Sequence, residues 1–151
     1  MDPSLTLFIG LLISFIILES TGIYPGGIIV PGFLSFYFPN PSRIAATFII
    51  SLIAIFIFRL VSSRTLLFGR RRFFFMILTG ALLSSLYGII LFKANTDYLL
   101  SFDSRAIGLI IPGLIANNSE KQGITKTFSA AIAALIMTWL LTKLLLTFIG
   151  T

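Results

Sequence analysis

The chain has 151 residues, of which 57% are hydrophobic and only 11% are charged, and its net charge is +6. Soluble domains carry about 25% charged residues, so this composition is typical of a polytopic membrane protein. Cysteine and histidine are both absent. Disulfides, zinc sites of the usual kind and Ser-His-Asp triads are therefore excluded.

The first half begins with a predicted membrane helix from about Pro3 to Leu18, which ends at Glu19. The N-terminus lacks the basic segment of a signal peptide, so we expect this helix to be retained. Residues 20–42 carry no charge but contain four prolines and four glycines, which excludes one regular helix. We expect two half-helices or a re-entrant loop there, shielded from lipid. A second membrane helix is expected from about 44 to 61.

The second half begins with a predicted helix over 73–92, a run without charged residues that is long enough to cross a membrane. A short connection of mixed charge, 93–105, leads to a second broken segment at 106–119. The last helix is expected from about 124 to 149. The sequence therefore predicts one all-α integral membrane domain with about four transmembrane helices and two segments broken by Pro and Gly.

A short phrase occurs once in each half: G-I-I-V-P-G-F-L at 27–34 and G-L-I-I-P-G-L-I at 108–115. Paired breaks at corresponding points of two halves are typical of membrane proteins whose functional centre lies between internal repeats. We interpret the phrase as a two-fold repeat of residues 1–69 and 70–151. Chance recurrence of a short apolar phrase is the alternative. The residues of interest in the two segments are Pro31, Gly32, Pro112, Gly113 and Asn117.

The orientation follows from the basic residues between the second and third helices. Arg59, Arg64 and the run Arg70-Arg71-Arg72 supply five of the eleven basic residues, with no acid between them. By the positive-inside rule this loop is expected to be cytoplasmic. Four crossings place both termini in the cytoplasm, and six crossings place both outside. We favour four.

Several charged or polar residues are candidate contacts for a partner or a polymer. The three arginines either anchor the third helix at the cytoplasmic surface or form a docking face. Glu19 either lies at the membrane surface or is paired at depth, with Arg43 and Arg105 as candidate partners. The polar run 113–123, which includes Lys121, either satisfies freed backbone groups, lines a path for polymer or ions, or forms an exposed turn.

Nucleotide and nucleic-acid binding are not supported by the sequence. Residues 123–127 lack the G-x-x-x-x-G-K-[ST] spacing of a P-loop. The arginine run lacks the polar surroundings of a nucleic-acid interface. No nucleophile is paired with a base, so we predict neither catalytic residues nor a cofactor or metal site in this chain.

Three stretches resemble one family, the membrane subunit of bacterial poly-γ-glutamate synthase, known as capsule-biosynthesis protein CapC/PgsC. E-S-T-G-I-Y-P-G-G-I-I-V-P-G-F-L at 19–34 resembles its E-x-T-G-I-x-P-x-G-x-x-V-P-G-Y-L. F-G-R-R-R-F at 68–73 is similar to its Y-G-R-R-K-F. R-A-I-G-L-I-I-P-G-L-I-A-N at 105–117, followed by K-Q-G at 121–123, is similar to R-G-I-G-x-I-V-P-G-L-I-A-N…K-Q-G. Phe33 and Ala106 depart from the expected Tyr and Gly.

The resemblance implies a non-catalytic subunit in a bacterial cell membrane that anchors a cytoplasmic ATP-dependent amide ligase. ATP and a divalent metal would then bind to the ligase and not to this chain. Other membrane or anchored synthase subunits, the lipid bilayer and the polyanionic poly-γ-glutamate are the further partners it implies, together with a role in passing polymer toward export. The alternative is a small secondary transporter or channel, as a homo-oligomer, with its site at the paired Pro-Gly segments.

Overall fold

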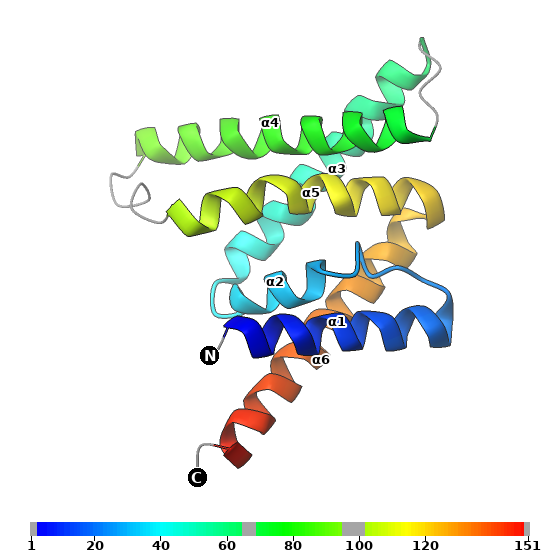
Figure 1. Ribbon diagram of the computed structural model, residues 1–151. Coiled ribbons are helices and arrows are strands. Elements are labelled where there is room, and N and C mark those ends of the chain that lie inside the picture. The colour runs from blue at the N-terminus through cyan, green and yellow to red at the C-terminus, as the bar shows by residue number, and fades with distance from the viewer. Residues whose placement is uncertain (1–2, 65–68, 95–101, 150–151) are drawn as a thin grey trace. The chain divides into compact units, whose positions relative to one another are not determined.

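The computed structural model describes residues 3–64, 69–94 and 102–149. For 90–94, 102–107 and 149 it describes the backbone only. These residues form helices and no strands, which confirms the all-α prediction (Figure 1). In chain order the helices are α1 (Pro3–Thr21), α2 (Val30–Phe36), α3 (Pro41–Ser62), α4 (Arg70–Ala94), α5 (Phe102–Gln122) and α6 (Ile124–Ile149).

Four of these helices, α1, α3, α4 and α6, are long and apolar enough to cross a membrane, as the sequence predicts. Each also carries large apolar side chains on its outside. The phenylalanines that are more than half exposed are Phe8, Phe15, Phe56, Phe74 and Phe148. Water disfavours such a surface, whereas lipid does not. The chain is therefore a multi-pass membrane protein.

The chain divides into two compact units, which we call the first and the second unit. The first unit combines residues 1–45 with 118–151, and the second unit is formed by 46–117. The units do not coincide with the two halves expected from the sequence. The first unit contains α1, α2 and α6, and the second unit contains α4 with most of α3 and α5. Each unit therefore combines helices of both halves.

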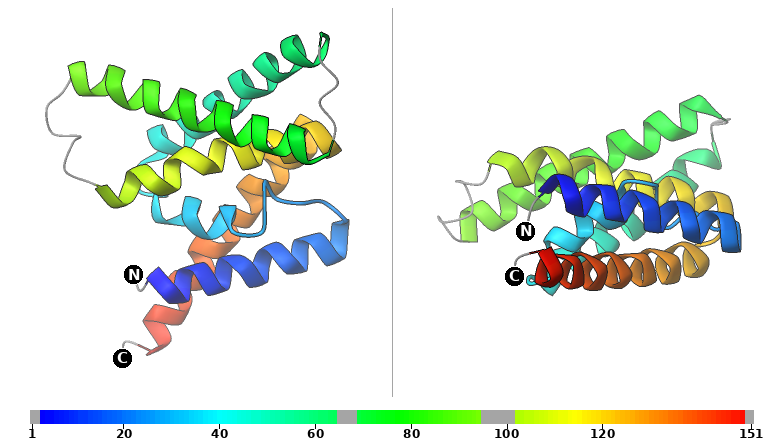
Figure 2. Two further views of the ribbon diagram at one scale, coloured as in Figure 1. Left: turned by 45° about the horizontal axis from the view of Figure 1, so that its top comes forward. Right: turned by 60° about the horizontal axis from the view of Figure 1, so that its bottom comes forward.

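In the first unit α1, α2 and α6 pack against one another. The buried core contains Ile9 and Ile13 of α1 and Ala134 of α6, and the three helices are labelled in Figure 1 and shown from two further sides in Figure 2. Leu5, Ile17 and Leu145 pack around this core. Because α2 returns beside α1 in the opposite direction, its Gly32 lies against Leu7, near the beginning of α1.

In the second unit α4 contacts both α3 and α5. The rings of Phe58 and Phe75 join α3 to α4 with their centroids 6.1 Å apart. Helices α4 and α5 run antiparallel, since Gly113 lies against Ile77 whereas Gly108 bonds to a later residue of α4, Ser84.

The prediction of a break at the second Pro-Gly phrase is wrong, because α5 continues through Pro112 as one helix. A proline removes the amide proton that would otherwise bind the carbonyl four residues earlier, here that of Gly108. The hydroxyl of Ser84 on α4 donates to this carbonyl at 3.3 Å. A neighbouring helix thus replaces the missing bond, which is how membrane helices tolerate proline.

Two glycines in the left-handed region end α1 and α5. Gly22 has φ 69° and its N–H donates to the Leu18 carbonyl at 2.8 Å. Gly123 has φ 102° and its N–H donates to the Ser119 carbonyl at 2.9 Å. Such a residue turns the chain and satisfies a carbonyl of the last helical turn. The end of α1 thus leads into the loop 22–29, and α6 begins directly after α5.

Candidate functional site

The loop 22–29 between α1 and α2 is held by two amide side chains at the end of α5. Gln122 accepts the Tyr24 N–H through Oε1 at 3.0 Å, and its Nε2 donates to the Tyr24 carbonyl at 2.5 Å. Asn118 donates from Nδ2 to the Gly26 carbonyl at 2.8 Å. Unwound backbone in a membrane needs such internal partners. Of the three interpretations of the polar run 113–123, satisfaction of freed backbone groups is therefore confirmed.

The orientation of Gln122 is fixed by a third bond. Its Nε2 also donates to Thr127 Oγ1 at 2.9 Å, in the first turn of α6, and Thr127 in turn donates to the Gly123 carbonyl at 2.9 Å. Thr127 is fully buried. One amide therefore connects the loop after α1, the end of α5 and the start of α6.

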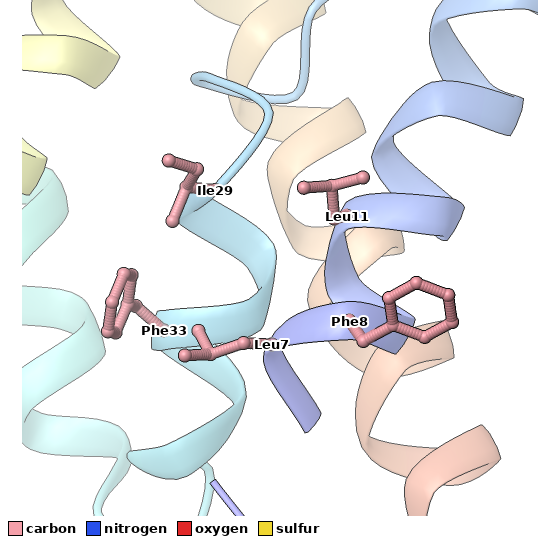
Figure 3. A pocket seen from close by; sticks show the side chains of 5 residues that line it. All are labelled: Leu7, Phe8, Leu11, Ile29 and Phe33. Carbon is pink, nitrogen blue, oxygen red and sulfur yellow. The ribbon is translucent and has the colours of Figure 1, made fainter. Parts of the chain in front are cut away.

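The first Pro-Gly phrase starts α2 and lies directly on α1. Pro31 is in the first turn of α2, where no amide proton is required. A Cβ built on Gly10 of α1 would lie 2.4 Å from the Cα of Gly32, so the two backbones touch. Absence of side chains permits this approach, as at many helix contacts in membranes. A shallow groove beside it has only apolar lining side chains, those of Leu7, Phe8, Leu11, Ile29 and Phe33 (Figure 3).

The second Pro-Gly phrase makes the corresponding contact in the second unit. A Cβ on Gly80 of α4 would lie 2.6 Å from the amide nitrogen of Gly113, and one on Gly113 would lie 2.6 Å from the Cα of Ile77. The recurring sequence phrase therefore has a recurring packing role. In each unit its glycine lies against a glycine of the helix that precedes it in the chain.

Asn117 is almost fully buried, at 3% exposure, and its Oδ1 has no hydrogen-bond partner within the described ranges. Ser119 Oγ is also buried and has no hydrogen-bond partner among the described residues. A buried polar group without a partner costs about 1–3 kcal/mol. The two side chains are about 200° apart around α5, because each helical residue turns the chain by about 100°. They do not form one site, and Asn117 Oδ1 by itself can accept only a single donor or cation.

The arginine run forms the first turn of α4. Arg70 and Arg71 are exposed, whereas Arg72 is half-buried and its Nε has no partner in the described part of the chain. No acidic residue lies in this first turn. The positive end of the helix dipole therefore coincides with three positive side chains, an arrangement that favours a bound anionic surface.

The other described candidate residues are Glu19, Arg43 and Lys121, and all three belong to the first unit. Glu19 lies exposed at the end of α1. Arg43 stacks over the Tyr37 ring, 5.6 Å from its centroid, beside the other end of α1. The pairing of Glu19 with Arg43 is thus not formed. Lys121 is exposed in the last turn of α5, and the side chain of Arg105 lies outside the described residues.

The sequence reasoning missed the glycines of α1 and α4 that receive the two phrases. A signal was present: G-L-L-I-S at 10–14 and G-A-L-L-S at 80–84 share their Gly, their third-position Leu and their Ser. Among the described residues no three His, Cys, Asp or Glu side chains cluster as metal ligands would.

The comparisons with known proteins agree on one family. The family model described as capsule biosynthesis CapC matches residues 9–128, which include both Pro-Gly phrases, the arginine run and Gln122. The PGA biosynthesis protein CapC of Bacillus subtilis (strain 168) is 38% identical over 136 residues, covering 87% of either chain. The capsule biosynthesis protein CapC of Bacillus anthracis is 35% identical over 136 residues, with the same coverage. No solved structure matches the chain. The chain therefore belongs to the capsule biosynthesis CapC family.

Proposed function

We propose that this chain is the membrane subunit of a poly-γ-glutamate synthase, in which it holds a cytoplasmic ATP-dependent amide ligase at the bacterial cell membrane. Two observations support the proposal. Relatives that cover most of the chain are named for PGA and capsule biosynthesis. The described part of the chain is a set of membrane helices with little extramembrane structure, which suits an anchor better than an enzyme.

The division of labour follows from the chemistry. Peptide-type bond formation needs activation of a carboxylate, which the ligase would accomplish by transferring the γ-phosphate of ATP to give an acyl phosphate and ADP. The amine of the next glutamate then displaces phosphate. ATP and its divalent metal bind to the ligase in this scheme, and this chain positions the ligase and passes the polyanionic product toward export.

The arginine run at the start of α4 is the proposed docking face. Each positive charge in the first turn of a helix is unfavourable by about 0.3–1 kcal/mol, and Arg70, Arg71 and Arg72 occupy that turn together. An acidic surface on the ligase would reverse this cost. Arginine also binds carboxylates through two parallel N–H donors, which fixes the geometry of the contact as well as its strength.

Replacement of all three arginines by Gln tests the docking face. The Arg70→Gln, Arg71→Gln, Arg72→Gln variant should insert in the membrane at the normal level but lose the ligase on mild detergent extraction and make no polymer. A matched variant with Lys at all three positions keeps the charge and should retain part of the ligase. An unchanged ratio of ligase to membrane subunit in the Gln variant would exclude the docking role.

Transport is the second candidate function, favoured by the unwound loop 22–29 inside a helical unit. Transporters bind their substrates at discontinuous segments of this kind. Purified protein reconstituted alone in liposomes should pass glutamate or poly-γ-glutamate if it is a transporter. The subunit proposal predicts no flux without the ligase.

A further inference from the structure

The segment from Tyr24 to Phe38 runs beside α1 and along part of α6 in the first unit. At one end Tyr24 bonds to Gln122 beside the first turn of α6. At the other end the ring of Phe38 stacks on Trp139, with centroids 4.2 Å apart. Thr127, which binds the same Gln122, and Trp139 are separated by 12 helical residues, or about 18 Å of α6.

The same segment also returns along α1, from beyond its last residue to Leu7. It begins three residues after Thr21, the last residue of α1. Its middle lies at the groove that Ile29 and Phe33 line together with Leu7 and Leu11 of α1 (Figure 3). Phe38 comes five residues after Phe33, and its ring stacks on Trp139 of α6. Since α1 is itself long enough to cross a membrane, a segment that returns beside it from its last residue to Leu7 is positioned to cross as well.

We propose that Tyr24–Phe38 is a discontinuous membrane crossing, so that the chain crosses six times in two halves of opposite orientation. The unwound part, 22–29, is tolerated because α5 supplies its hydrogen bonds, and the short helix α2 completes the passage. The crossing from the end of α4 to the start of α6 is made by α5, whose Pro112 is compensated by Ser84. Both termini then lie on the side opposite the arginine run.

The distribution of basic residues agrees better with six crossings than with four. With six crossings, seven of the eleven basic residues lie on the side of the arginine run. These are Arg59, Arg64, Arg70, Arg71, Arg72, Lys121 and Lys126. With four crossings, Lys121 and Lys126 move to the outside and Lys143 moves to the inside, which gives six of eleven. The positive-inside rule favours the larger asymmetry.

Six crossings also place further charged residues on the cytoplasmic side of the membrane. The turn between α5 and α6, with its exposed Lys121 and Lys126, joins the arginine run on the same side of the membrane. Glu19, exposed at the end of α1, lies on that side too. The aromatic and basic residues at the other end of the first unit, Tyr37, Trp139 and Lys143, are then an anchor at the outer surface, where such residues are enriched.

Single-cysteine labelling tests the topology directly, because the chain contains no cysteine that would have to be removed. Suitable positions are exposed and lie near helix ends: Ser4, Ser20, Asn40, Ser63, Thr125 and Thr147. Each variant is treated with a membrane-impermeant maleimide, once in right-side-out vesicles and once in inside-out vesicles. Ser63→Cys and Asn40→Cys are matched controls, since either topology places Ser63 inside and Asn40 outside.

Six crossings predict that the Ser20→Cys and Thr125→Cys variants react only in inside-out vesicles, together with Ser63→Cys. The Ser4→Cys and Thr147→Cys variants should react only in right-side-out vesicles, together with Asn40→Cys. Reaction of Ser20→Cys and Thr125→Cys from the same side as Asn40→Cys would overturn the proposal. If one of the two fails to react, the other decides, because the two topologies place it on opposite sides. The result does not depend on the function proposed above.

Discussion

The contact between Gly10 on α1 and Gly32 on α2 predicts a measurable cost for adding one methyl group. A Cβ at Gly10 would lie 2.4 Å from Gly32 Cα and 2.6 Å from its nitrogen, and backbone atoms cannot move aside by changing rotamer. Ordinary contact begins at 3.4 Å, so the helices must separate by about 1.0 Å, the difference between 3.4 and 2.4 Å.

The expected magnitude follows from two opposing effects. Overpacking of this kind costs about 1–3 kcal/mol, and the better helix propensity of Ala over Gly returns up to about 1 kcal/mol. With the full return, we therefore expect Gly10→Ala to lower the free energy of unfolding by up to about 2 kcal/mol. Gly80→Ala should behave alike in the second unit, since its Cβ would lie 2.6 Å from the nitrogen of Gly113.

The matched control is Gly88→Ala, also on α4. A Cβ at Gly88 meets no atom of the described residues within 4 Å, so the gain in helix propensity is the effect expected there. This variant should be as stable as the native chain or more stable by up to about 1 kcal/mol.

The assay is thermal unfolding of purified protein in mild detergent, followed by helical circular dichroism. Fluorescence of Trp139, the only tryptophan, reports on the first unit separately because its ring stacks on Phe38. A change of 1 kcal/mol corresponds to about 2–4 °C in a chain of this size. Equal midpoints for Gly10→Ala, Gly80→Ala and Gly88→Ala would refute the reasoning, since the three differ only in what the new methyl group meets.

Two further predictions concern the polar end of the first unit. Gln122→Glu keeps an acceptor for the Tyr24 N–H but loses the donor to the Tyr24 carbonyl and to Thr127 Oγ1, at about 0.5–1.5 kcal/mol for each bond. Hydrogen exchange at the Tyr24 amide should stay slow in this variant and become fast in Gln122→Leu, and equal exchange in both would contradict the bonding. If the α5–α6 turn shares the docking face, the double variant Lys121→Gln, Lys126→Gln should reduce the amount of copurified ligase several-fold. Lys143→Gln, in the second half of α6, should leave that amount unchanged. An equal loss of ligase in both variants would argue against a docking role of the turn.

Much of the fold could be predicted from the sequence because membrane helices are encoded locally. The last helix was expected from 124 to 149, and the structure has it at Ile124–Ile149. Each run is uniformly apolar and its ends are marked by charge, glycine or proline, so no long-range contact is needed to place it. The irregular stretch before Pro31 was also predicted, since four prolines and four glycines between 20 and 42 exclude one helix in any context.

The two Pro-Gly phrases show that a short sequence motif does not by itself determine the local backbone structure. They are nearly the same, yet Pro31 begins a short helix after an unwound loop and Pro112 lies inside a continuous one. The difference comes from partners distant in the sequence: Ser84 supplies the bond that Pro112 removes, and Gln122 supplies those of the loop at Tyr24.

The sequence by itself determined the class of protein, the apolar helices and the family, because these depend on composition, run length and short motifs. Only the tertiary structure decided which glycines touch, which side chains satisfy the unwound backbone, and that Glu19 and Arg43 lie at opposite ends of the first unit. Those outcomes depend on how helices pair. In a membrane, pairing is set by close backbone approach and internal hydrogen bonds between residues up to 98 positions apart.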